Sequence, residues 1–264
     1  MENRLTRKKT KIIEVQRVSF GGDIKPIIAG PCAVEDEEIY LESIKECKKI
    51  GASLIRGNIF KPRTSPHSFQ GIGIEGINVL KQAKKMIDLP IVMEILDYQR
   101  LDDVYDVIDM IQIGARNMQN FSLLKEVGKT KKPILLKRGL ASTIEEWLLA
   151  AEHIIAAGNE NIVLCERGIR TFEPSIRFSL DITSVPVVKE FSNFPIVIDP
   201  SHSAGDPRYI KALCKAGLAV GADGLMVEVH SNPEKALCDG KQALTIDGFK
   251  EIVAELEQMN FRIR

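Results

Sequence analysis

The segment IRGNIFKPRTSPHSFQG, residues 55–71, places three cationic side chains among glycines, prolines and hydroxyls. Arg56 ends an apolar run, and Lys61 and Arg63 follow in a stretch that glycine and proline keep from forming a helix. Such cations occur on ordinary solvated loops, and they also occur where phosphate or carboxylate groups bind. Pro62 stiffens the KPRT stretch, and residues two apart in an extended chain point the same way. We therefore expect Lys61 and Arg63 to reach one anionic ligand.

Charged residues also stand where other short apolar runs end. Arg116, Lys137 and Arg167 are cations at such positions, and Glu94 and Asp199 are carboxylates. If the six cations meet in this chain of zero net charge, several anionic groups must offset their mutual repulsion. Two phosphates and a carboxylate would do so, and the sequence therefore favours a phosphorylated substrate.

A second set of residues has the chemistry of metal ligands. It consists of one thiol, one imidazole and two carboxylates, from Cys32, His202, Glu228 and Asp239. This mixture suits a divalent first-row ion and is too varied for a closed structural zinc site. Three members also have an ordinary interpretation. A free cysteine is usually a small buried residue, Asp239 precedes a glycine as turn residues do, and His202 could form hydrogen bonds within its loop. The four come from separate segments, so only the fold can bring them together.

Eight short apolar runs without polar alternation predict strands of a sheet that is buried on both faces. They span residues 26–30, 52–58, 91–95, 109–114, 133–137, 161–165, 195–199 and 224–229. Segments of helical period lie between them, for example 35–51, 142–158 and 206–221. This alternation predicts a (β/α)₈ TIM barrel, in which the ends of the strands build the site. A doubly wound open sheet is the alternative, but the chain lacks a Gly-rich phosphate turn after its first strand.

Local signals set the expected boundaries. We expect residues 1–25 to form a short hairpin that turns near Gly21-Gly22 and covers the bottom of the barrel. Residues 26–264 would then form one catalytic barrel domain. Ser142, three residues before Glu145, and Asp206, just before a proline, predict the starts of two helices.

Composition excludes several classes of function. Lys plus Arg and Asp plus Glu number 36 each, which leaves no charge excess for nucleic acid or an anionic membrane. No apolar run reaches the ~20 residues of a membrane span, and the N-terminus lacks the apolar core of a signal peptide. The five cysteines are odd in number and form no CxxC pair. We expect a reduced, cytoplasmic protein with no nucleic-acid or membrane partner.

Taken in order, the motifs resemble a known family. AGPCAVE, FKPRTSPHSFQG, IQIGARNMQN, LLKRG, CERGIRTFEP, IDPSHSAG and MVEVH…LCDGKQAL are similar to 3-deoxy-arabino-heptulosonate 7-phosphate (DAHP) synthase, type I-beta branch. The resemblance covers residues 26–250. The sister family, 3-deoxy-manno-octulosonate 8-phosphate synthase, is similar around AGPC but has KANRSS where this chain has KPRTS.

The resemblance implies a metal-dependent condensation of phosphoenolpyruvate with erythrose 4-phosphate, the first step of the shikimate pathway to aromatic amino acids. The implied ligands of a divalent ion (Mn, Fe, Co or Zn) are Cys32, His202, Glu228 and Asp239. For phosphoenolpyruvate, the implied contacts are Arg116 and Arg167 at its phosphate and Arg56 and Lys137 at its carboxylate. For erythrose 4-phosphate, they are Lys61, Arg63 and Thr64. The family's members usually associate, so a homodimer or homotetramer is expected.

We add two expectations about catalytic residues and one about inhibition. We expect Lys61 to protonate the forming alkoxide. Either Glu94 or Asp199 would steer the attacking water, unless that carboxylate instead orients a neighbouring ligand. Because only about 25 residues precede the first barrel strand, we also expect no inhibition by phenylalanine, tyrosine, tryptophan or prephenate.

Three other functions remain open at this stage. The first is the sister synthase reaction, with arabinose 5-phosphate as acceptor. The second is a Schiff-base aldolase that uses Lys137 as nucleophile and needs no metal ligands. The third is a non-catalytic phosphometabolite sensor, which predicts that some metal ligands are lost, and none of the four is lost here.

Overall fold

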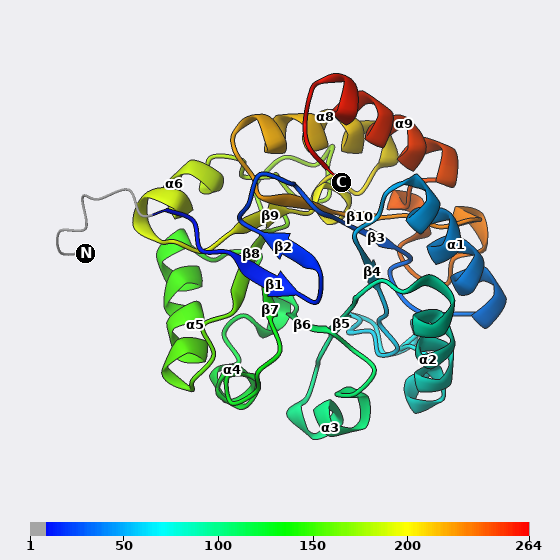
Figure 1. The fold of residues 1–264 in the computed structure, drawn as a ribbon, viewed down its shortest axis with the longest axis horizontal. Helices are drawn as coiled ribbons and strands as arrows, with labels where there is room; N and C mark the ends of the chain where they lie inside the picture. Colours follow the sequence, from blue (N-terminus) through cyan, green and yellow to red (C-terminus); the bar gives the residue numbers. More distant parts are fainter. Residues whose placement is uncertain (1–8, 264) are drawn as a thin grey trace.

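The computed structural model describes residues 9–263, and a closed barrel of eight parallel strands forms its centre (Figure 1). In chain order these strands are β3 (Ile27–Gly30), β4 (Leu54–Arg56), β5 (Ile91–Glu94), β6 (Met110–Ile113), β7 (Ile134–Lys137), β8 (Ile162–Glu166), β9 (Ile196–Ile198) and β10 (Gly224–Glu228). Each predicted apolar run contains most or all of one strand. The barrel closes where β10 pairs with β3, with Leu225 opposite Ile27. The predicted (β/α)₈ fold is confirmed.

Helices surround the barrel (Figure 1). They are α1 (Glu37–Ile50), α2 (Gly76–Ile87), α3 (Leu101–Val104), α4 (Phe121–Gly128), α5 (Ile144–Ala156), α6 (Ser184–Phe191), α8 (Pro207–Ala219) and α9 (Ile246–Gln258). Each helix turns an apolar side toward the strands; α2, for example, buries Val79, Leu80 and Ala83. Full burial of a side chain such as Leu80 stabilises the fold by about 1.5–3 kcal/mol. Among the described residues, no helix has the length and apolar character needed to cross a membrane.

The start of α5 corrects one expectation. Thr143, and not Ser142, caps this helix: its hydroxyl accepts from the Glu146 backbone N–H, and the Glu146 carboxylate accepts from the Thr143 backbone N–H. Both pairs have the three-residue spacing of a capping box, and the backbone turns into the helix one residue later than predicted. At α8 the predicted cap is confirmed, because Asp206 accepts from the Arg208 backbone N–H at 2.9 Å.

Alternation along the strands divides the barrel interior into an apolar and a polar layer. Leu54 and Leu135 point inward and join one buried apolar cluster. Two positions further along each strand, where side chains return to the same face, stand Arg56 and Lys137. The barrel therefore directs its polar residues to the end where the strands finish.

A hairpin of β1 (Ile13–Val15) and β2 (Val18–Phe20) covers the opposite end and lies across the barrel in Figure 1. Ile13, Val15 and Phe20 are buried in the same cluster as the inward apolar layer. The hairpin turns at Gln16-Arg17, with Gln16 at φ 53°, so the prediction of a turn at Gly21-Gly22 is wrong. Gly21 instead lies close to the Lys11 carbonyl, where a Cβ would be 2.4 Å from the oxygen. The first eight residues of the predicted extension lie outside the described residues.

Candidate active site

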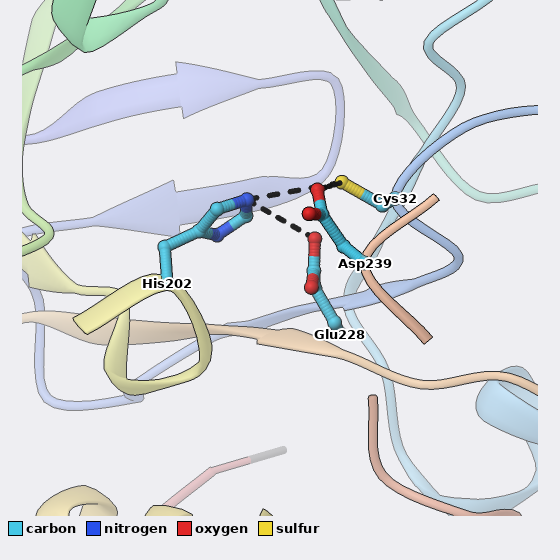
Figure 2. Close-up of side chains that lie close together, drawn as sticks. All are labelled: Cys32, His202, Glu228 and Asp239. Atoms are coloured by element: carbon cyan, nitrogen blue, oxygen red, sulfur yellow. Dashed lines mark hydrogen bonds and ion pairs between the residues drawn. The ribbon is translucent and has the colours of Figure 1, made fainter. Parts of the chain in front are cut away.

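The four predicted metal ligands meet at the polar end of the barrel (Figure 2). Cys32 follows β3, His202 lies in α7 (Pro200–Ala204), Glu228 ends β10, and Asp239 precedes the short helix η5 (Gly240–Gln242). Their donor atoms all lie within 4.8 Å of one another. The Asp239 Oδ2 atom is 3.1 Å from the Cys32 sulfur, and the His202 Nε2 atom is 3.1 Å from Glu228 Oε1. This donor set and spacing fit one divalent ion.

Asp199 holds the His202 ring in place. It ends the β9 segment and caps α7, because its Oδ1 accepts from the His202 backbone N–H at 3.0 Å. Its Oδ2 lies 2.7 Å from His202 Nδ1 and 2.6 Å from Lys137 Nζ. Burial opposes ionisation of Asp199, but the charges of His202 and Lys137 outweigh burial and hold its pKa well below the usual range. Asp199 thus stays charged and leaves His202 Nε2 facing the other ligands.

Glu228 is fixed through both of its oxygens. Arg56 donates from Nη1 to Glu228 Oε1 at 2.8 Å, and the Gln242 amide donates to Oε2. Burial would raise the pKa of Glu228, but His202 and Arg56 lower it well below its usual value. The carboxylate is therefore ionised, as a metal ligand must be.

Cys32 is poised as a thiolate. Burial raises the pKa of the thiol most strongly, but a hydrogen bond from Cys238 and the charges of Lys61 and Arg56 lower it to about 6. The Lys61 ammonium contacts the Cys32 sulfur directly, and Arg56 Nη2 lies 3.5 Å from it. The thiolate is the form of cysteine that binds metals.

A pocket of about 250 Å³ opens beside this cluster. Of the residues that the structure describes, two carboxylates line it, Glu94 and Asp239, against seven cations: Arg56, Lys61, Arg63, Arg116, Lys137, Arg167 and Arg177. Among the described residues, buried N–H groups without a hydrogen-bond partner occur in Arg56, Arg63 and Arg167. Buried unpaired donors are costly, so the pocket is built for a ligand with several anionic oxygens.

The loops after β4 and β6 meet at this pocket. Arg116 donates from Nη2 to the Thr64 hydroxyl at 3.4 Å, and both residues line the cavity. On its inner wall, the Glu94 Oε2 atom accepts from the Gln112 side chain at 3.1 Å. A bound molecule would therefore touch residues from several strand ends at once.

The structure places the predicted site residues at the same end of the barrel. Eight of them line the pocket without belonging to the metal cluster: Arg56, Lys61, Arg63, Thr64, Glu94, Arg116, Lys137 and Arg167. His202 and Asp239 belong to both the pocket and the cluster, and Cys32 and Glu228 to the cluster. Asp199 is fully buried behind His202 and does not line the pocket.

Sequence reasoning missed three polar residues of the site. Gln112 could have been found, because it is a polar residue inside an apolar strand. It lines the pocket together with Gly114, two residues later. Arg177 lines the pocket from the loop after β8, and Gln242 holds Glu228 from η5. Neither ends a strand, so the strand-end criterion could not find them.

Comparisons with known proteins identify the family of this chain. A family model described as the DAHP synthetase I family matches residues 8–263. A Thermotoga maritima protein, phospho-2-dehydro-3-deoxyheptonate aldolase, is 48% identical over 248 residues, which cover 94% of this chain and 73% of the relative. A solved structure of that enzyme, also called DAHP synthase, matches with a TM-score of 0.91 at 47% identity and covers 95% of this chain and 74% of its own.

The sister family is more distant. A 2-dehydro-3-deoxyphosphooctonate aldolase from Geobacter sulfurreducens is 31% identical over 271 residues, which cover 95% of this chain and 98% of the relative.

A second solved structure is again a DAHP synthase. This truncated Thermotoga maritima 3-deoxy-D-arabino-heptulosonate 7-phosphate synthase matches with a TM-score of 0.88 at 44% identity, covering 95% of this chain and 92% of its own. From the family match and these identities, the chain belongs to the DAHP synthetase I family.

Proposed function

We propose that this chain condenses phosphoenolpyruvate with erythrose 4-phosphate to give DAHP and inorganic phosphate. One observation carries the proposal: the cation-lined pocket and the Cys–His–Glu–Asp cluster share His202 and Asp239. An anionic substrate in the pocket therefore lies against the metal ligands. Family membership supports the same reaction.

Phosphoenolpyruvate presents a phosphate and a carboxylate to the inner part of the pocket. Arg116 and Arg167 take the phosphate, and the unpaired buried Nη1 of Arg167 supports this role. Arg56 and Lys137 take the carboxylate; the Nε of Arg56 is likewise buried and unpaired. Guanidinium groups suit such planar or multi-oxygen anions.

Erythrose 4-phosphate occupies the side of the pocket formed by the loop after β4. Arg63 and Thr64 hold its phosphate, and the buried unpaired Nη1 of Arg63 supports that role. Thr64 already contacts Arg116, so the two phosphates would bind on adjoining walls. Lys61 then stands beside the aldehyde end.

In the reaction, carbon 3 of phosphoenolpyruvate attacks the aldehyde, water adds at carbon 2, and phosphate leaves. A divalent ion held by Cys32, His202, Glu228 and Asp239, for which Mn, Fe, Co and Zn are candidates, supplies Lewis-acid polarisation when bound.

Lys61 donates the proton to the forming alkoxide. Its Nζ contacts Cys32 and lies 3.2 Å from Asp239 Oδ2, at the boundary between pocket and cluster. Burial would lower the pKa of Lys61, but Cys32 and Asp239 raise it, so Lys61 carries a proton that it can donate. Glu94, fixed by Gln112, faces the pocket and orients the attacking water, while Asp199 orients His202.

The decisive experiment supplies metal-loaded protein and phosphoenolpyruvate with either erythrose 4-phosphate or arabinose 5-phosphate. We expect phosphate release with the four-carbon acceptor only. Release with arabinose 5-phosphate alone would assign the sister reaction instead.

A Schiff-base mechanism at Lys137 receives no support from the geometry. The Lys137 ammonium is buried and lies 2.6 Å from Asp199 Oδ2, and that mechanism gives the metal-ligand cluster no role. Borohydride in the presence of substrate should leave the activity unchanged, and a chelator should abolish it.

A further inference from the structure

We propose that Arg177 and Gln242 act as a positioning pair for the two carboxylates of the metal site, Glu228 and Asp239. The inference rests on the metal-binding role proposed above and extends it to two residues outside the cluster. The pair would set the affinity of the site for its ion and the geometry of the bound ion. Four observations lead to this assignment.

Gln242 connects Glu228 to Arg177. The buried Gln242 amide donates from Nε2 to Glu228 Oε2, and its Oε1 accepts from Arg177 Nη1 at 2.7 Å. An arginine only donates and an ionised carboxylate only accepts, so the amide has a single orientation that satisfies both partners. Gln242 is therefore fixed at both ends.

Arg177 also reaches the second carboxylate. Its Nη1 lies 3.8 Å from Asp239 Oδ1, whereas Asp239 Oδ2 is the oxygen that contacts the Cys32 sulfur at 3.1 Å. The guanidinium thus attracts the outer oxygen and leaves the inner oxygen directed at the cluster. Gln242 thus positions one oxygen of Glu228, and Arg177 positions one oxygen of Asp239.

Backbone hydrogen bonds attach the Arg177 segment to α7, the helix that contains His202. The Arg177 backbone N–H donates to the Ala204 carbonyl at 3.1 Å, and the Phe178 N–H donates to the Ser203 carbonyl at 2.7 Å. Gly205 ends α7 at φ +70°, and a Cβ there would be 2.7 Å from the Arg177 Cβ. Arg177 therefore packs against α7, which contains a third metal ligand, His202.

A contact with the Phe178 ring also restricts the Arg177 side chain. The Arg177 guanidinium carbon lies 5.6 Å from the centre of the Phe178 ring, and that of Arg167 lies 4.5 Å from it. A ring face at this distance attracts a guanidinium and restricts its position. About a third of the Arg177 side chain remains exposed, so the positioning force comes from these contacts rather than from burial.

The physical consequence concerns the metal more than the substrate. Carboxylates that are held in place before the ion binds lose less conformational freedom when it binds. Loss of residues that orient metal ligands typically weakens metal affinity by about 10- to 100-fold. Arg177 acts on Glu228 through Gln242 but on Asp239 directly, so removing both residues should weaken metal binding more than removing Gln242 alone.

The test titrates chelator-treated protein with Co²⁺ and follows thiolate-to-cobalt absorption, which reports both the dissociation constant and the geometry of the ion. The variants are Gln242→Met, which keeps the length but loses both hydrogen bonds, Arg177→Met, Arg177→Lys and the double Met variant. We expect the dissociation constant to rise about 10- to 100-fold in the Met variants, with a shifted spectrum and partial rescue by Lys. The double variant should bind Co²⁺ more weakly than Gln242→Met, because it also loses the Arg177–Asp239 contact, but by less than the sum of two independent losses.

Arg208→Met is the matched control, because this exposed arginine pairs with Asp206 and should bind Co²⁺ as the unmodified chain does. Circular dichroism checks that each variant folds; should a Met variant fail to fold, Arg177→Lys and Gln242→Glu replace it. Gln242→Glu can still accept from Arg177 but repels Glu228, so we expect a loss of affinity there as well. Unchanged affinity and spectrum in the folded variants would overturn the inference alone. An unmodified chain without thiolate-to-cobalt absorption would overturn the proposed metal site as well.

Discussion

At the scale of single residues, Cys32 tests the metal site most directly. Its pKa of about 6 leaves mostly thiolate at neutral pH, and no other donor of the cluster is a sulfur. We expect Cys32→Ala to lose bound metal and turnover while its circular dichroism stays unchanged. Metal content after dialysis and the rate of phosphate release measure the two effects.

The control for Cys32→Ala is Cys47→Ala, which removes a buried thiol from α1, outside the cluster. It should retain both metal and rate. Near-normal turnover of Cys32→Ala with no bound metal would show that the ligand assignment is wrong.

Arg63 tests the assignment of the two phosphates. Removing a charge-assisted hydrogen bond costs about 1.5–3 kcal/mol, or roughly ten- to a hundred-fold in affinity. Arg63→Ala should therefore raise the Michaelis constant for erythrose 4-phosphate by that factor and change the constant for phosphoenolpyruvate little. Steady-state kinetics with each substrate varied in turn separate the two effects.

Arg170→Ala is the matched control, since Arg170 is an exposed cation that does not line the pocket. It should leave both constants unchanged. If Arg63→Ala weakens only phosphoenolpyruvate, the loop after β4 binds the other substrate.

Most of the site was predictable from the residues because a charge that ends an apolar run is visible in the sequence. Lys137 and Glu228, for example, occupy the last position of β7 and β10, and each points into the barrel. Arg177 and Gln242 were not predictable, since they lie outside the barrel strands and act through other side chains. Asp199 shows a third case, because only the packing reveals that it faces His202 and not the pocket.

At the scale of elements, the start of α5 offers a matched pair of substitutions. Thr143 makes the reciprocal hydrogen bonds of a capping box with Glu146, and neighbouring Ser142 does not. We expect Thr143→Ala to lower the free energy of unfolding by about 1 kcal/mol, the usual cost of losing a cap. Ser142→Ala should change it by a few tenths of a kcal/mol, within the range of ordinary surface substitutions. Urea denaturation of the two variants measures the difference, and an equal loss in both would contradict the observed cap.

The helices and strands were predictable to within a few residues, but the exact helix boundary and the position of the hairpin turn were not. Short apolar runs rich in Ile, Val and Leu indicate strands that are buried on both faces, because helices of a globular protein are usually longer and amphipathic. Ser142–Glu145 and Thr143–Glu146 have the same spacing, so only the backbone path selects between them. The hairpin turn shows the same limit: the paired glycines suggested it, whereas Gln16 adopts the left-handed conformation.

At the scale of the whole molecule, the two ends of the barrel have different tasks. The hairpin and the inward apolar layer fill one end, and the pocket and metal ligands occupy the other. In barrels of this type the end where strands begin serves stability, and the end where they finish serves catalysis. A substitution at the hairpin should therefore change unfolding without changing the chemistry.

Phe20 allows this separation to be tested. Its side chain is fully buried in the cluster that joins the hairpin to the strands, and it lies near Gly224, the first residue of β10. Phe20→Ala should cost about 3–5 kcal/mol, because the cavity it leaves cannot collapse completely. In a barrel of this size each kcal/mol lowers the melting temperature by about 2–4 °C. The turnover number and both Michaelis constants should stay unchanged well below that temperature, since the site lies at the opposite end. Ile12→Ala, at a neighbouring side chain that is 44% exposed, should change neither property appreciably. A loss of turnover in Phe20→Ala protein that is still folded at the assay temperature would contradict the division of tasks between the two ends.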